Sequence, residues 1–210
     1  MIKVVVVDDH AVVREGLKRI IAESPGMAVT GEASDGHEAL SVVRKDPCDV
    51  VVLDISMPNK NGLDVLKQLH IDSPRLPVLV LSMHSEDQYA IRVLRAGAAG
   101  YLTKESAPGK LVQAIRKVVR GGRYVSPTLA EKLVFDLDTD LNKAAHEILS
   151  DREYQVLCLI ASGKTVGEIA EELALSVKTI STYRVRILEK LRMKNNAELT
   201  RYAIKNGLVD

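Results

Sequence analysis

Five side chains with the chemistry of a phosphoryl site follow apolar runs in the first half of the chain. Asp8 and Asp9 come directly after a run of four valines, and Asp54 ends the run VVVLD. Ser82 and Lys104 stand at the ends of two later apolar runs. Adjacent carboxylates repel each other and are costly to bury unless a cation compensates them. These residue types therefore indicate a bound cation.

The ligand chemistry favours magnesium. With oxygen ligands only, a hard divalent ion such as Mg²⁺ is favoured over zinc. Magnesium takes a few carboxylates, several waters and a phosphate oxygen. Lys104 offers a phosphoryl group a positive charge, and Ser82 offers it a hydroxyl donor. The pattern predicts a magnesium-dependent phosphoryl site with Asp54 as the nucleophile.

Each of these residues also has a simpler explanation. An Asp that follows a strand often caps the next helix, and a Lys at a strand end is usually only solvated. We favour a shared site because four of the five expected strands deliver a polar group to the same edge. We interpret His10 as a surface residue at the start of a helix rather than as a catalytic residue.

The elements that must position these residues alternate between strands and helices. Short apolar runs are separated by stretches with helical periodicity, for example Val13, Leu17 and Ile20. This alternation predicts a parallel five-stranded sheet covered by helices on both faces. The carboxyl ends of such strands share one edge of the sheet. The expected strands lie at residues 3–7, 27–33, 49–54, 77–82 and 98–103.

The composition is that of a water-soluble protein with an aliphatic core. Of the 210 residues, 46% are hydrophobic and 27% are charged, with a formal net charge of +1, one Phe and no Trp. Cys48 and Cys158 are far apart, which fits buried thiols in a reducing cytoplasm better than a disulfide or a zinc site. No stretch approaches the roughly 18–20 apolar residues of a membrane span. We expect a cytoplasmic protein without a membrane partner.

The periodicity changes along the chain and predicts two domains. Residues 1–122 carry the alternation of strands and helices. Residues 123–149 are in part acidic and turn-prone, which is typical of a linker that includes some helix. Residues 150–210 form a small all-α domain of four helices, and Ser150 with Glu153 fits a capping box at its start.

A short helix, a tight turn and a longer basic helix within residues 165–191 indicate a helix-turn-helix, whose second helix enters the DNA major groove. One stripe of the longer helix should pack inward, and its members are Ile180, Tyr183, Ile187 and Leu191. An amphipathic helix with a solvated basic side is the simpler alternative. The side chains turned away from the stripe are Lys178, Ser181, Thr182, Val185 and Arg186.

The motifs VVDDH, VVLDISMPNKNG, VLSMH and AGAAGYLTK resemble the receiver domain of bacterial response regulators over about residues 1–120. The resemblance implies a flavodoxin-like sheet of strand order 2-1-3-4-5. It implies that a histidine kinase phosphorylates Asp54, and that Lys104 and Ser82 stabilise the phosphoryl group. It also implies that Tyr101 is an aromatic switch that follows Ser82 inward.

The same resemblance implies how Mg²⁺ is held. Asp9, Asp54 and the main-chain carbonyl of Ser56 would ligate the ion, whereas Asp8 would act through a water. One departure from the family pattern stands directly after Lys104, where many members have a proline in a cis peptide and this chain has Glu105.

The segment LSDREYQVLCLIASGKTVGEIAEELALSVKTISTYRVRILEKL resembles the LuxR-type DNA-binding domain, and the whole chain resembles the NarL/FixJ family of response regulators. This implies a phosphorylation-dependent transcriptional regulator that binds double-stranded DNA as a homodimer, with a fourth helix at about 197–206 that pairs across the dimer. Ser181 and Tyr183 replace residues common in the family, so the base preference should differ. The implied DNA-contacting residues are Lys178, Thr179, Ser181, Thr182, Val185 and Arg186.

Three other functions are open to this sequence. Phosphoaspartyl hydrolases also use an aspartate nucleophile and Mg²⁺, but they have a second Asp as general acid where this chain has Ser56. A receiver could also act on a target other than DNA. A dinucleotide-dependent enzyme is disfavoured because no GxGxxG motif follows the first strand.

Overall fold

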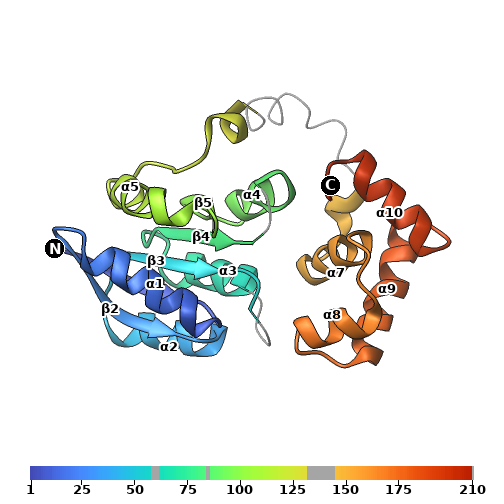
Figure 1. Cartoon of the computed structure of the whole chain (residues 1–210), viewed down its shortest axis with the longest axis horizontal. Coiled ribbons are helices and arrows are strands. Elements are labelled where there is room, and N and C mark those ends of the chain that lie inside the picture. The colour runs from blue at the N-terminus through green and yellow to red at the C-terminus, as the bar shows by residue number, and fades with distance from the viewer. Residues whose placement is uncertain (58–61, 84–85, 132–144, 210) are drawn as a thin grey trace. The chain divides into compact units, whose positions relative to one another are not determined.

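The computed structural model describes residues 1–57, 62–83, 86–131 and 145–209. The chain forms two compact units, Met1–Ala130 and Glu131–Asp210. Figure 1 shows a sheet with helices in the first unit and helices in the second. Each unit buries its own apolar side chains.

Five parallel strands form the sheet of the first unit. They are β1 (Ile2–Val7), β2 (Met27–Ala33), β3 (Val50–Asp54), β4 (Val78–Ser82) and β5 (Gly100–Thr103). Their order is β2-β1-β3-β4-β5, which confirms the predicted topology. Because β1 and β3 are neighbours and run in the same direction, Asp8 and Asp54 reach the same edge of the sheet.

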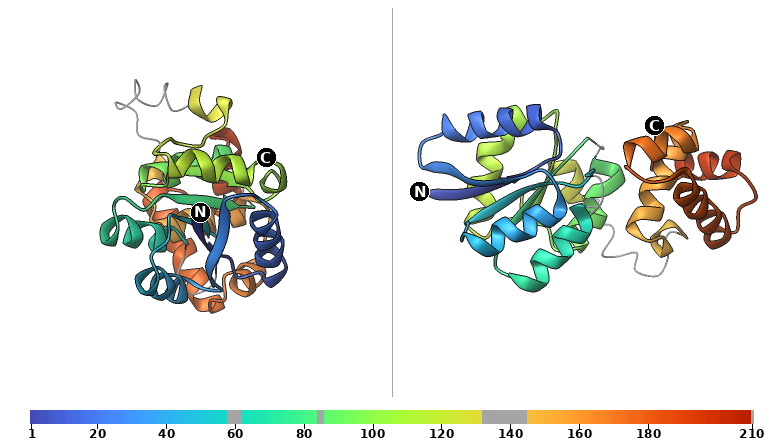
Figure 2. Two further views of the ribbon diagram at one scale, coloured as in Figure 1. Left: turned by 90° about the vertical axis from the view of Figure 1, so that its left-hand side faces the viewer. Right: turned by 90° about the horizontal axis from the view of Figure 1, so that it is seen from below.

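Helices cover both faces of this sheet. Within the described part of the unit they are α1 (Ala11–Ala22), α2 (Gly36–Lys45), α3 (Gly62–Asp72), α4 (Glu86–Arg95) and α5 (Ala107–Val119). Figure 2 shows α1 and α5 on one face and α2 and α3 on the other. The two-sided cover explains the uninterrupted valine run of β1, because side chains on both faces of the strand are buried.

Alternate side chains of one strand enter different layers of the core. Val4 packs in a cluster that includes Leu111 of α5. Val5 points to the opposite face and lies beside Gly31 of β2. A Cβ atom at Gly31 would lie 2.6 Å from the side chain of Val42, so the missing side chain lets α2 approach the sheet closely.

Tyr124 lies just after α5 and pairs with the edge strand β5. The Tyr101 amide donates to the Tyr124 carbonyl at 3.0 Å, and the Tyr124 amide donates to the Ala99 carbonyl at 2.9 Å. Lys117 lies over the Tyr124 ring, 5.8 Å from its centroid. These bonds cover part of an exposed strand edge.

The domain limits at residues 122 and 150 stay predictions.

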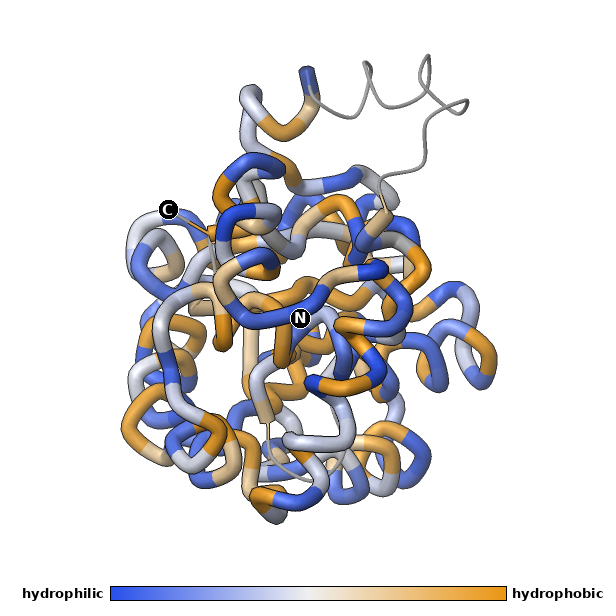
Figure 3. Tube along the Cα trace, turned by 90° about the vertical axis from the view of Figure 1, so that its right-hand side faces the viewer, coloured by the Kyte–Doolittle hydropathy of each residue, from blue (hydrophilic) through white to orange (hydrophobic). Residues whose placement is uncertain are grey.

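The second unit consists of short helices with an apolar centre. They are the 3₁₀ turn η1 (Ala145–Ile148) and the helices α7 (Asp151–Ala161), α8 (Val166–Glu172), α9 (Val177–Leu191) and α10 (Asn196–Lys205). These four α-helices confirm the predicted all-α domain. Figure 3 shows hydrophobic and hydrophilic residues alternating along the helical turns. The buried residues at its centre include Leu157, Ile169, Ile187 and Leu199.

Side-chain caps fix where these helices begin. The predicted capping box of Ser150 and Glu153 is present at the start of α7. A second capping box, of Thr165 and Glu168, opens α8. Each box satisfies main-chain N–H groups that the first helical turn leaves unpaired.

None of the helices in the described ranges combines the length and the apolar character that crossing a bilayer requires.

Gly62, the first residue of α3, lies against the end of β3, and this contact can be tested by substitution. A Cβ atom there would collide with the Asp54 carbonyl oxygen and would lie 2.6 Å from the Ile55 Cα atom. Because main-chain atoms cannot rotate away, we expect Gly62→Ala to lower the free energy of unfolding by about 1–3 kcal/mol. Urea unfolding followed by circular dichroism measures the change.

The control for this substitution is Gly109→Ala in α5, where a Cβ atom would meet nothing within 4 Å. We expect this change to be neutral or to stabilise the protein by up to about 1 kcal/mol, because Ala favours helix more than Gly does. Equal losses of stability in the two variants would contradict the proposed clash.

Candidate functional site

The carboxyl ends of β1, β3 and β5 bring three charged side chains into contact. Lys104 Nζ lies 2.8 Å from Asp8 Oδ2 and 2.7 Å from Asp54 Oδ2. Both aspartate side chains are fully buried, and the Lys104 side chain is 8% exposed. One buried ammonium group therefore faces two buried carboxylates, which leaves an excess of negative charge.

Burial and the neighbouring charges act in opposite directions on these groups. Burial raises the pKa of Asp54, the Lys104 ammonium group acts to lower it, and the Asp8 carboxylate raises it further; the pKa ends above its ordinary value. Burial acts to lower the pKa of Lys104, but the Asp54 and Asp8 carboxylates outweigh it, and this pKa is raised. Lys104 is therefore held in its charged form, and its charge opposes the effect of burial on the pKa of Asp54.

The loop between β1 and α1 arranges the second acidic residue. Asp8 Oδ1 accepts a hydrogen bond from the His10 amide at 2.8 Å. His10 Nδ1 lies 2.9 Å from Asp9 Oδ1 and 3.4 Å from Asp8 Oδ1. The His10 side chain is 62% exposed, which agrees with a surface position, and yet its ring reaches the carboxylates. The sequence places His10 directly after the acidic pair, but only the structure shows that its ring turns toward the carboxylates.

These residues fit a divalent cation. One ligand atom from each of Asp8, Asp9, His10 and Asp54 lies within 4.8 Å of all the others. Asp9 Oδ1 is a buried oxygen atom that accepts no hydrogen bond from the described residues, although His10 Nδ1 is near. A cluster of carboxylate oxygens with such an atom suits a hard ion such as Mg²⁺.

The other predicted site residues lie along the same strand ends. The Ser56 amide donates to Asp54 Oδ1 at 3.0 Å. The Ser82 side chain is fully buried at the end of β4, and its main-chain carbonyl accepts from the Lys104 amide at 2.8 Å. Tyr101 of β5 is also fully buried. Among the peptide bonds described, including the one between Lys104 and Glu105, none is cis.

In the second unit, α8 and α9 are joined by a four-residue turn, as in a helix-turn-helix. The turn contains Ala174, whose φ of 50° is in the left-handed region, and it ends at Ser176. Ser176 Oγ caps α9 by accepting from the Thr179 amide at 3.0 Å, and it also lies 2.8 Å from Thr179 Oγ1. The cap places Thr179 half-buried in the first turn of α9.

The outer face of α9 carries the predicted DNA-contacting side chains. Ile180 and Ile187 are fully buried on the opposite face, as the sequence predicts. Thr182 Oγ1 donates to the Lys178 carbonyl at 2.9 Å, and the exposed oxygen can still accept a hydrogen bond. Val185, 47% exposed, is an apolar side chain on a polar face. The exposed members of the predicted set are Lys178, Ser181, Thr182, Val185 and Arg186.

Two basic residues of α9 instead hold the domain together. Arg184 Nε donates to Asn196 Oδ1 of α10 at 2.5 Å. Lys190 Nζ lies 2.6 Å from Glu153 Oε2, and that carboxylate is almost fully buried beneath α9. Burial acts to raise the pKa of Glu153, but hydrogen bonds from Lys190 and Ser150 lower it below its ordinary value. The sequence alone did not separate these structural cations from the exposed ones.

Comparisons with known proteins identify both units. The family model of the response regulator receiver domain matches residues 4–116, and that of the luxR family of bacterial regulatory proteins matches residues 147–203. The response regulator GacA of Pseudomonas syringae pv. syringae strain B728a is 40% identical across 100% of this chain and 99% of its own length. The chain belongs to the NarL/FixJ family of response regulators. This confirms the predicted family.

Further relatives of this response regulator match over nearly the whole chain. The response regulator UvrY of Escherichia coli K12 is 39% identical across 99% of this chain and 96% of its own length. A solved structure of RcsB from Salmonella typhimurium is 27% identical, covers 98% of both chains and has a TM-score of 0.68.

Two of the solved RcsB structures that contain DNA match nearly the whole chain. One is described as an RcsB–DNA complex, with 28% identity, coverage of 97% of this chain and 98% of that chain, and a TM-score of 0.59. In the other, RcsB from Salmonella enterica serovar Typhimurium is bound to the promoter rprA in the presence of the phosphomimetic BeF₃⁻, with 29% identity, coverage of 96% and 98%, and a TM-score of 0.65.

The pairing of Lys104 with two carboxylates predicts the effect of its removal from this response regulator. Lys104→Met leaves Asp8 and Asp54 buried together without their common cation. We expect the free energy of unfolding at pH 7 to fall by about 3–5 kcal/mol. Adding Asp54→Asn in the same chain should restore part of the loss, because it removes one of the two charges. Urea unfolding of the wild type, of Lys104→Met and of the double variant measures these free energies.

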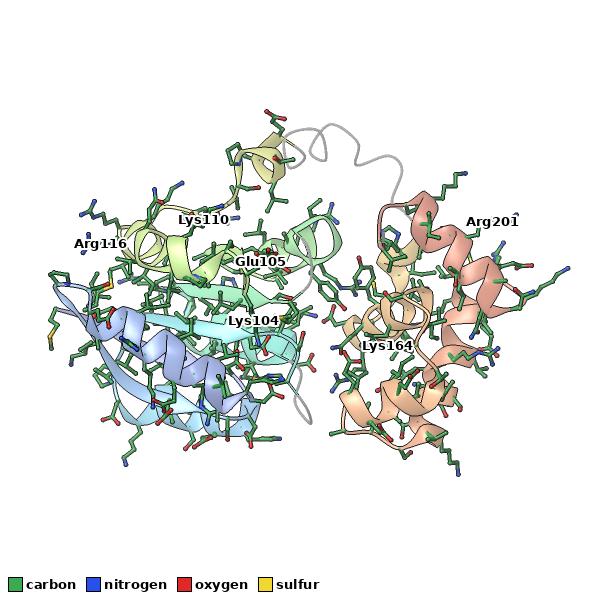
Figure 4. The ribbon with its side chains drawn as sticks, viewed as in Figure 1. Lys104, Glu105, Lys110, Arg116, Lys164 and Arg201 are labelled. Atoms are coloured by element: carbon green, nitrogen blue, oxygen red, sulfur yellow. The ribbon has the colours of Figure 1, made fainter. Side chains whose placement is uncertain are left out.

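Lys110→Met is the control, because Lys110 is an exposed lysine of α5 (Figure 4). Its stability should stay within about 0.5 kcal/mol of the wild type. A Lys104→Met protein as stable as the Lys110→Met protein would show that the buried ion pairs contribute nothing to the free energy of unfolding.

Proposed function

We propose that this response regulator is a phosphorylation-dependent DNA-binding transcription factor of a two-component system. Asp54 accepts a phosphoryl group from a sensor histidine kinase, and the modified receiver domain controls DNA binding by the second domain. The observation that carries the proposal is the contact of Lys104 with Asp54 and Asp8 at one edge of the sheet. We place the protein in the cytoplasm, where it meets DNA.

The chemistry of the transfer assigns a role to each charged group. An Asp54 carboxylate oxygen forms a bond to phosphorus while the bond between phosphorus and the kinase histidine breaks and its electrons stay on the histidine nitrogen. Lys104 acts to lower the pKa of Asp54 before the transfer and provides positive charge for the phosphoryl oxygens after it. Ser82 provides a hydroxyl group to the same oxygens, and Tyr101 is the switch residue that follows it.

The metal assignment rests on the acidic cluster. Asp9, Asp54 and the Ser56 carbonyl are proposed as direct Mg²⁺ ligands, and Asp8, which is already paired with Lys104, acts through a water. A bound Mg²⁺ supplies positive charge against the acidic residues and the transferred group. The buried Asp9 Oδ1, which accepts no hydrogen bond from the described residues, supports its direct role.

The DNA-binding assignment rests on the outer face of α9. Lys178 and Arg186 are exposed and flank the exposed Ser181, Thr182 and Val185. The positive charges fit phosphates, the hydroxyl groups fit base edges, and Val185 fits a thymine methyl group. Thr179 lies among them, and its hydroxyl group is engaged with Ser176 in the cap of α9. The DNA complexes of the related RcsB support this use of the domain.

Phosphorylation should act by changing the pairing of subunits. A phosphoryl group adds roughly −1.5 to −2 charges at Asp54, which biases the receiver toward a second arrangement. One small domain reads only a half-site, so a homodimer provides the affinity and specificity that regulation needs. We place the contact between DNA-binding domains on the C-terminal helix α10.

The first test measures phosphoryl transfer. We expect the wild type to take labelled phosphate from a phosphorylated histidine kinase domain, Asp54→Ala to take none, and Asp64→Ala, an exposed aspartate in the first turn of α3, to behave as the wild type. Labelling of Asp54→Ala at the wild-type rate would refute the site. Rapid turnover of external phosphate esters would instead support a hydrolase.

The second test measures duplex binding against salt concentration. Replacing Lys178 and Arg186 by Ala should weaken binding and make the slope of log affinity against log salt less negative by about 2, because two phosphate contacts are lost. The control replaces two exposed basic residues of the receiver, Lys45 and Arg75, and should leave the slope unchanged. Equal slopes in the two double variants would contradict the role of α9.

A further inference from the structure

Arg14 of α1 reaches back to the loop that carries the acidic pair. Its Nη1 atom donates to the main-chain carbonyl of Asp8 at 2.7 Å. Its side chain is only 17% exposed, and its Nε atom is buried. The sequence analysis assigned no role to this arginine. A largely buried guanidinium group one helical turn after the loop is a strong constraint on the loop.

A second and longer contact, an ion pair rather than a hydrogen bond, lies on the other side of the guanidinium group. Arg14 Nε lies 3.5 Å from Glu32 Oε2, near the end of β2. Glu32 is itself held by Lys18, whose Nζ lies 3.1 Å from the same oxygen, and Lys18 also pairs with Glu15 at 2.6 Å. The hydrogen bond from Lys18 is the main cause that lowers the pKa of Glu32, so Glu32 faces Arg14 as a carboxylate.

The contact with the Asp8 carbonyl constrains the main chain from which the Asp9 side chain departs. The carbonyl oxygen of Asp8 and the amide of Asp9 belong to one planar peptide group. Holding that oxygen fixes the plane from which the Asp9 side chain departs. The start of α1 does not hold the loop by a cap of its own, because His10, its N-cap residue, makes no side-chain capping bond within the described structure.

We propose that Arg14, held by Glu32, is a positioning residue that orients the Asp8–Asp9 peptide so that the Asp9 carboxylate meets Mg²⁺. The inference rests on the proposed function, because it concerns the same metal site. Arg14 does not touch the ion; it acts through the main chain of the residue before the proposed ligand. Groups of this kind around a metal ligand typically change metal affinity by 10- to 100-fold when they are removed.

A purely structural role for Arg14 predicts a different result. If the guanidinium group only fastened α1 to β2, its loss would lower stability and leave the Mg²⁺ affinity of the folded protein unchanged. If it orients Asp9, its loss weakens Mg²⁺ binding in a protein that remains folded. The two roles are therefore separated by metal affinity rather than by stability.

The experiment measures Mg²⁺ binding by the full-length chain from amide chemical shifts in a nuclear magnetic resonance titration. Arg14→Met keeps the aliphatic stem and removes the guanidinium group; we expect its dissociation constant for Mg²⁺ to rise about tenfold. Glu32→Gln keeps Arg14 but weakens its anchor, and should give a smaller rise. The rate of phosphorylation of Arg14→Met by a small-molecule phosphodonor should recover toward the wild-type rate as Mg²⁺ is raised.

Arg19→Met is the matched control, because Arg19 lies on the same helix and pairs with Glu23 in an exposed ion pair far from the loop. Its Mg²⁺ affinity should stay within about twofold of the wild type. If Arg14→Met unfolds, Glu32→Gln provides the test. Mg²⁺ affinities of Arg14→Met and Glu32→Gln equal to that of Arg19→Met would refute the positioning role.

Failure of this inference is distinguishable from failure of the proposed function. A wild type that shows no Mg²⁺-dependent shifts, or an Asp54→Ala protein that still takes phosphate, would overturn the phosphoryl site itself. A wild type that binds Mg²⁺ and is phosphorylated on Asp54, beside an Arg14→Met protein with unchanged affinity, would overturn only the role of Arg14.

Discussion

The ion pairs of Lys104 with Asp8 and Asp54 are the constraint around which the receiver domain is organised. Two carboxylates and one ammonium group are buried together at distances below 3 Å. The lysine makes the burial of the carboxylates possible, and it leaves one negative charge in excess before Asp9 is counted. A site of this charge is unsatisfied by the protein alone, which is the physical reason that it suits a divalent cation and a group that changes charge.

The surrounding structure serves to bring these three residues to one place and to hold them there. They lie at the ends of three different strands, and the order β2-β1-β3-β4-β5 puts the ends of β1 and β3 side by side with β5 within reach of them. The short loops that follow the strands are fixed by bonds to the site itself: Asp8 accepts from the His10 amide, and Asp54 accepts from the Ser56 amide. Each carboxylate of the proposed site therefore also holds the local backbone.

In the DNA-binding domain, contacts of basic side chains hold helices together. Its basic residues are divided between structure and surface: Arg184 and Lys190 pair with groups of α10 and α7, whereas Lys178 and Arg186 stay exposed. The pair of Lys190 with the buried Glu153 joins α9 to the capping box of α7, so the helix proposed to read DNA is fixed to the rest of its domain. The basic residues that hold the domain together and those proposed to contact DNA are thus neighbours on one helix.

The sequence by itself determined the layered architecture, the family and the identities of the charged residues at the strand ends, because hydrophobic period and strand-end position are local properties of the chain. It also determined the capping box at the start of α7 and most of the inward stripe of α9. Only the tertiary structure decided that Lys104 pairs with Asp8 as well as Asp54, that His10 reaches Asp9, and that Arg14 holds the Asp8 carbonyl. These contacts depend on side-chain directions across packed elements, and no spacing along the sequence encodes such directions.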